Sequence, residues 1–121
     1  MFTVDDRVFE SRELKGYATY VADSELVEGR TYFRVYGLDK HGHIPQLDAL
    51  VFIGPDRASG DAGLLYFQDA ESYLAGVRFD SATNDDAEFH RVDRQTSFVQ
   101  DFEHALNCLL RCSMDRRAAG L

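Results

Sequence analysis

The chain has 121 residues, of which 45% are hydrophobic and 28% are charged, and this composition is typical of one globular domain. Its formal net charge of −8 argues against a surface-wide attraction to nucleic acid or to anionic membranes. No apolar run approaches the roughly 18 residues of a membrane span, and the first residues lack the features of a signal peptide. We therefore expect one cytoplasmic domain over residues 1–121. Arginine outnumbers lysine by 11 to 2, which we take to indicate a bacterial, GC-rich genome.

The first third of the chain is rich in β-forming residues. We expect a short strand over Phe2–Phe9 and a second strand over Leu14–Ala22. Thr31–Leu38 alternates most clearly, and it should pair with the second strand as an antiparallel hairpin. Its side chains divide between two faces, with Phe33 and Val35 on one and Tyr32, Arg34 and Tyr36 on the other.

The middle of the chain alternates between turns and short apolar runs. Asp39–His43 is a glycine-containing turn, and Ile44 should be extended because a proline follows it. Ala49–Ile53 is a continuous apolar run, which predicts a strand buried on both faces beneath the C-terminal helix. Gly54–Gly63 reads as a long loop, and Leu64–Gln68 as another strand.

The sequence DAESYLAG, which follows, has two interpretations. It can form a two-turn helix with Asp69 as the N-cap and Gly76 at the end. Alternatively its first residues form a turn, and Ser72–Phe79 forms a strand; we favour the strand, because period-two alternation continues to its end. Asp80–Asp86 is then a polar loop, and Glu88–Val92 is the last strand.

The C-terminal segment, from about residue 97 to 117, has the pattern of a long amphipathic helix. Ser97 and Gln100 have the spacing of a capping box, and two arginines followed by Gly120 mark the end. At 100° per residue the apolar side chains gather on one side, and these are Phe98, Val99, Phe102, Ala105, Leu106, Leu109 and Leu110.

Together these elements predict a single α+β domain. About six or seven short strands cover residues 2–92 and form a mostly antiparallel meander, because the connections are too short for helical crossovers. The sheet should curl into a barrel-like form or lie flat against the helix. We expect Phe98, Phe102, Leu106 and Leu109 to be buried against Val51, Ile53, Val35 and Phe33.

Asp39, His41 and His43 are the best metal-ligand candidates, since alternate residues of an extended segment point to one side. A complete site requires a further ligand, and no fourth group is identifiable. A plain polar turn is the favoured interpretation, and no cofactor is expected. The acidic segment that includes Asp85 and Asp86 lacks the ligand spacing of a calcium loop.

Catalytic motifs are not found in the sequence. Cys108 and Cys112 lie four residues apart on the helix, where we expect reduced packing residues rather than nucleophiles or a disulfide. His90 and His104 have no neighbouring nucleophile at a recognised spacing. The glycine-rich loop lacks the phosphate-binding pattern. The sequence therefore favours a protein without enzymatic activity.

Tyrosines on the expected strands, accompanied by arginines, suggest a binding face, because both residue types are enriched at interface hot spots. The candidate binding residues are Tyr32, Arg34, Tyr36, Tyr73 and Arg78. We expect an interaction domain that binds a protein partner, which the acidic charge suggests is basic, in an inhibitor or immunity-like role, or that forms a homodimer. The alternative is a small ligand-binding protein or enzyme with a pocket between sheet and helix, using His90 or the 39–43 turn.

Overall fold

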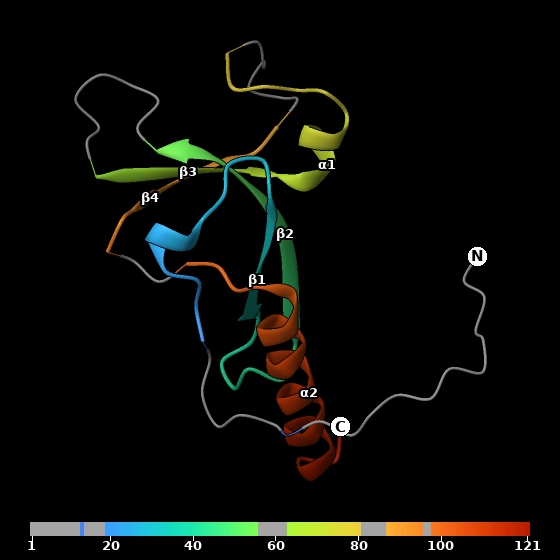
Figure 1. Ribbon diagram of the computed structural model, residues 1–121. Coiled ribbons are helices and arrows are strands. Elements are labelled where there is room, and N and C mark those ends of the chain that lie inside the picture. The colour runs from blue at the N-terminus through green and yellow to red at the C-terminus, as the bar shows by residue number, and fades with distance from the viewer. Residues whose placement is uncertain (1–12, 14–18, 56–62, 81–86, 96–97) are drawn as a thin grey trace, which may run out of the picture.

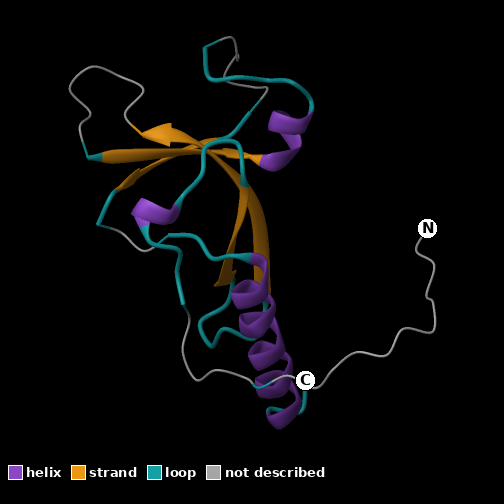
Figure 2. Cartoon of the chain, viewed as in Figure 1, coloured by secondary structure: helices purple, strands orange, loops and turns teal. Residues whose placement is uncertain are grey.

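The computed structural model describes residue 13 and residues 19–55, 63–80, 87–95 and 98–121. Four strands form one sheet in the order β1–β2–β3–β4, and each neighbouring pair is antiparallel (Figures 1 and 2). The elements are η1 (Asp23–Glu25), β1 (Thr31–Gly37), β2 (Pro45–Pro55), β3 (Leu64–Asp69), α1 (Ala70–Leu74), β4 (Phe89–Asp93) and α2 (Phe102–Ala118). The predicted α+β architecture, an antiparallel meander with a long C-terminal helix, is confirmed.

The sheet is smaller than predicted and is not closed. The described residues form four strands rather than six or seven, and the expected strand over Phe2–Phe9 lies outside them. Thr19–Ala22, the described end of the expected second strand, is not part of the sheet. The backbone at Phe33 in β1 exchanges two hydrogen bonds with Gln100, of 2.8 and 2.6 Å. The outer edge of β1 is therefore bonded there to the segment before α2, and the predicted N-terminal hairpin is wrong for the described residues.

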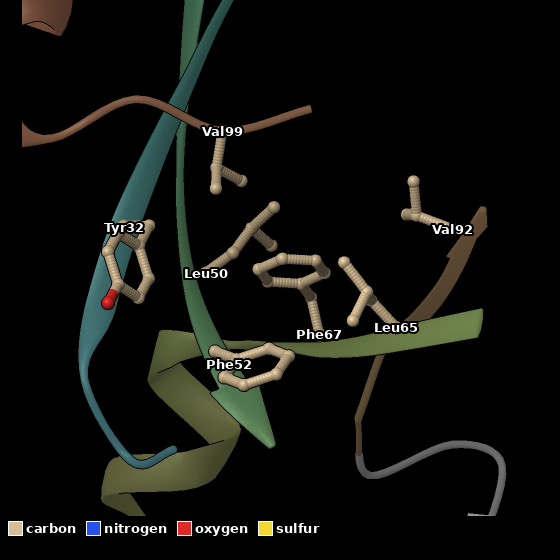
Figure 3. Close-up of a cluster of buried hydrophobic side chains, with 7 residues drawn as sticks. All are labelled: Tyr32, Leu50, Phe52, Leu65, Phe67, Val92 and Val99. Atoms are coloured by element: carbon tan, nitrogen blue, oxygen red, sulfur yellow. The ribbon is translucent and has the colours of Figure 1, made fainter. Parts of the chain in front are cut away.

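β2 is buried on both faces, as its apolar run predicts. One face contributes to a cluster centred on Phe67, and Figure 3 shows its members: Tyr32, Leu50, Phe52, Leu65, Phe67, Val92 and Val99. On the other face Val51 and Ile53 pack with Tyr66, and Tyr73 and Phe89 lie against them. The expected cover is wrong, however, because α2 packs against β1. The second face of β2 is covered by residues from α1 and β4.

The first turn of the predicted helix is extended chain. α2 begins at Phe102, with Asp101 as its N-cap: the Asp101 Oδ1 accepts the backbone N–H of His104 at 2.8 Å. Ser97, the predicted cap, lies outside the described residues. Val99 is 2% exposed and belongs to the core cluster. Its burial and the strand-like hydrogen bonds of Gln100 keep this segment extended, although its sequence has helical periodicity. The predicted stop at Gly120 is confirmed by its positive φ of 78°.

Phe102 is the clearest error in the expected core. Its side chain is 57% exposed and meets Phe33 edge-on, with 5.1 Å between ring centroids. Val51 and Ile53 pack with Tyr66 instead. The sequence pattern predicts one apolar face along the whole helix. In the structure the first residues of that pattern line the sheet core, whereas Phe102 lies at the surface.

The segment after β3 is helix α1, so the favoured strand interpretation is wrong. Asp69 caps the helix through Oδ2, which accepts the backbone N–H of Ser72 at 2.9 Å. Gly76 ends it with a φ of 92°, a conformation that disfavours other residues. Local capping chemistry therefore decides the conformation here, and the alternation that continues to Phe79 does not.

Candidate functional site

The three candidate binding residues on β1 share one face, but Tyr32 is not at the surface. It is 4% exposed, and its hydroxyl accepts the backbone N–H of Val27 at 2.8 Å. Figure 3 shows Tyr32 with the other members of the core cluster. Its position is that of a structural residue, which fixes the segment after η1 to β1.

Arg34 and Tyr36 are half-buried and engaged with each other. The Arg34 Nη2 donates to Asp48 Oδ2 at 2.9 Å across the β1–β2 pair. The guanidinium carbon lies 4.5 Å from the Tyr36 ring centroid and 5.1 Å from that of Phe98. These contacts join the hairpin to the segment before α2, which gives Arg34 a packing role.

The Asp39–His43 turn is organised by backbone contacts. Asp39 Oδ1 accepts the backbone N–H of Ile44 at 2.7 Å, and this bond is the main reason that the pKa of Asp39 lies below its usual 3.8. The rings of His41 and His43 lie 5.9 Å apart. In the described ranges, no group of three or more His, Cys, Asp or Glu side chains is placed to hold a metal ion.

The two cysteines are free thiols that face different neighbours. Cys108 lies against the Gln100 side chain, with 3.3 Å between Sγ and Nε2. Cys112 donates to the carbonyl of Gly42 at 3.4 Å, and one turn later Arg116 donates to the carbonyl of His43 at 2.6 Å. These contacts tie the end of α2 to the β1–β2 turn, consistent with the packing role expected for the thiols.

His104 and His90 each contact a carboxylate. The His104 Nδ1 lies 2.8 Å from Asp101 Oδ1, on the residue that caps α2. The His90 Nε2 lies 3.3 Å from Glu88 Oε1, and its ring stacks obliquely on Phe98 at 5.9 Å. Both histidines therefore have local structural partners, and neither contact involves a serine or cysteine nucleophile.

The first candidate surface is a row of four large apolar side chains along α2, which we call the helix strip: Phe102, Leu106, Leu110 and Met114. Their spacing of four residues aligns them along one side of the helix. Phe102 and Met114 are 57% and 55% exposed, and the two leucines between them are half-buried. A different side of α2 faces the rest of the chain. It carries the buried Ala105, together with Cys112 and Arg116, which donate hydrogen bonds to the hairpin turn.

The charges along α2 differ in their balance at the two ends. Asp101 and Glu103 lie at its start, and Arg116 and Arg117 lie in its last turn beside a single acidic residue, Asp115. This order matches the helix dipole, which favours acidic residues at the start and basic residues at the end. The helix strip is thus an apolar row with an acidic end and a basic end.

The second candidate is a cavity of about 200 Å³ between β2, β3 and the α1 region. It brings together two predicted binding residues, Tyr73 and Arg78, and it does not include the three on β1. The Arg78 guanidinium lies 3.8 Å from the Tyr73 ring centroid. The described residues that line it are Glu28, Ile53, Gln68, Tyr73, Arg78, Phe79 and Asp80.

Gln68 is the lining residue that sequence reasoning missed. It is fully buried, and its Nε2 donates to Ser72 Oγ and to the carbonyl of Val77, both at 2.9 Å. Among the described side chains, its Oε1 is one of two buried polar atoms without a hydrogen-bond partner; the other is Arg34 Nε. A lone amide at the end of an apolar strand, LLYFQ, was the available signal, because such a group requires partners when buried.

Comparisons with known proteins do not add a relationship: no protein-family model, curated protein or solved structure matches the chain. Neither α2 nor any other helix in the described ranges combines the length and apolar character needed to cross a bilayer.

Proposed function

We propose that this protein is a non-enzymatic interaction domain that pairs with a second copy of itself through the helix strip. The observation that carries the proposal is the exposure of Phe102 and Met114, at the two ends of a continuous apolar row. Burying such a row against another apolar helix contributes roughly 25 cal/mol for each Å² removed from water. Among the described residues, α2 contacts β1, the hairpin turn and Gln100, while Phe102 and Met114 stay more than half exposed.

The charge pattern of α2 favours a second copy as the occupant. Two antiparallel copies bring the acidic end of each helix, with Glu103, to the basic end of its partner, with Arg117. The same pairing opposes the two helix dipoles and aligns both apolar rows. A twofold dimer is self-complementary in this manner without any second sequence.

The test is the mass of the protein in solution over about 1–100 µM, measured by sedimentation equilibrium. We expect a dimer for the natural sequence and a monomer for the double variant Leu106→Gln, Leu110→Gln, which removes the centre of the strip. The matched control is Asp115→Gln, an exposed position on another side of α2, which should remain dimeric. Circular dichroism of each variant establishes that α2 is still folded.

A monomer of the natural sequence throughout this range overturns the self-association proposal. A dimer that persists in the double variant, with α2 intact, assigns the interface to another surface. Association of the natural sequence with a purified basic protein, lost in the double variant while the chain alone is monomeric, would instead support a heteromeric inhibitor role.

A further inference from the structure

We propose that the cavity at Gln68, Tyr73 and Arg78 binds a small organic cation, of the primary-amine or guanidine class, with Gln68 Oε1 as an acceptor. This inference goes beyond the proposed function, since the cavity and the helix strip belong to different parts of the chain. The cavity lies by α1, whereas the strip is on α2, and these two helices lie at different ends of the sheet (Figure 1).

Gln68 supplies a fixed, buried acceptor among the residues that line the cavity. Its amide orientation is determined by Val77, whose carbonyl can only accept and therefore faces the NH₂ group. Ser72 accepts the second N–H, because its own hydroxyl donates to Asp69 Oδ1 at 2.6 Å. Oε1 is thus held in place with no described donor, and a buried acceptor without a partner carries a free-energy cost. A ligand that brings an N–H group to this atom removes that cost.

The surroundings of the cavity already stabilise a cation, the Arg78 guanidinium. Its Nη1 donates to the carbonyls of Tyr73 and Val77 at 2.9 and 2.8 Å, and its carbon lies over the Tyr73 ring. Glu28 and Asp80 add two carboxylates to the same lining. Acceptors and an aromatic face, with one arginine and two carboxylates among the described lining residues, suit a donor-rich cation and disfavour an anion.

The position of Arg78 determines how a ligand enters. Gln68 is fully buried, so its Oε1 lies beneath the groups that line the cavity. Arg78 is exposed, and its displacement would free the Tyr73 ring and one acceptor position on each of two carbonyls, which also accept from Gly76 and Gln68. A volume of about 200 Å³ lies below the roughly 300–1,000 Å³ of drug-sized sites, so the ligand has only a few carbons.

The test is a titration of the full chain with putrescine, followed by the backbone amide NMR signals of Gln68, Tyr73 and Phe79. The matched probes are butanediol, which is neutral, and succinate, which is anionic. We expect saturable shifts with putrescine below about 10 mM and none with the other two. In Arg78→Ala, which removes the resident cation, putrescine should bind about threefold more tightly or better. Arg78→Lys, which keeps the charge but not the planar group, should lie between the two.

Three outcomes overturn the proposal. One is the absence of saturable putrescine shifts both in the natural sequence and in Arg78→Ala. Another is saturable succinate binding that Arg78→Ala abolishes, which would identify an anion site held by the arginine. The third is weaker putrescine binding in Arg78→Ala with the fold intact, which would contradict the competition between ligand and arginine. The helix-strip dimer should be unchanged in Arg78→Ala, so each proposal can fail independently.

Discussion

Phe67 and Phe102 show how strongly the surroundings of one residue type can differ within this chain. Phe67 is 1% exposed at the centre of the core cluster, where its ring contacts Phe52 and Phe98. Phe102 is 57% exposed, and among the described residues its one aromatic contact is Phe33. Because a cavity in a packed core costs transfer energy and lost contacts, Phe67→Ala should lower the free energy of unfolding by about 3–5 kcal/mol.

Phe102→Ala should lower that free energy by only about 1–2 kcal/mol at concentrations where the chain is monomeric, because less than half of this residue is buried. Urea unfolding of both variants measures the difference. A loss above about 3 kcal/mol at Phe102 would show that the residue is buried in the monomer. If the free energy of unfolding falls only at concentrations where the chain associates, the decrease comes from lost contacts in the proposed dimer.

Residue type alone was sufficient to select Tyr73 and Arg78 as binding candidates, but it placed them on the wrong element. The sequence predicts a strand there, and the structure has the end of α1 followed by a turn. For Tyr32 the alternation identified the correct face and could not show which face the chain covers. That cover comes partly from Val99, far away in the sequence, and such long-range contacts leave no periodic signal.

At the scale of elements, Asp69 joins three pieces of the chain. It ends β3, caps α1 through Ser72, and accepts the backbone N–H of Glu88, just before β4, at 2.7 Å. Partial burial raises the pKa of its carboxyl, but the hydrogen bonds from Ser72 and Glu88 outweigh that effect and leave the pKa below 3.8. The ionised carboxylate is therefore bound more favourably in the folded state than in the unfolded chain.

Asp69→Asn leaves one acceptor oxygen where the carboxylate uses two, so it should lower the free energy of unfolding by about 1 kcal/mol at pH 7. A folded-state pKa below the unfolded value means that the contribution is fully present above about pH 4 and is lost as pH falls through the folded pKa. The difference between the natural sequence and the variant should therefore shrink as pH falls below about 4, as urea unfolding at several pH values can measure. A constant difference over that range would contradict a role for the charge.

The elements themselves were predictable where local chemistry is strong. The apolar run of β2, the alternation of β1 and the stop at Gly120 all have the structure that their patterns indicate. The start of α2 was not predictable from the sequence, because Gln100 forms strand-like hydrogen bonds with Phe33, 67 residues earlier in the chain. A helical periodicity continues through such a segment even when tertiary hydrogen bonds hold it extended.

At the scale of the whole molecule, the acidic excess opposes the association that the helix strip favours. Each copy carries a net charge of −8, and this repulsion acts between entire surfaces, over distances that salt screens effectively. In the proposed dimer, the attraction between Glu103 and Arg117 would act at short range, and exposed pairs of this kind contribute about 0–1 kcal/mol. The apolar contact is not weakened by salt.

Raising the salt concentration from about 0.05 to about 0.5 M should therefore tighten the dimer by about threefold or more, because the screening length falls from above 10 Å toward 3 Å. Sedimentation equilibrium at both concentrations measures the dissociation constant, and a neutral osmolyte at matched osmolarity is the control. A dimer that weakens as salt rises would mean that charge pairs, rather than the apolar strip, hold the two copies together. In that case Arg117→Gln, and not the double leucine variant, should be the substitution that dissociates them.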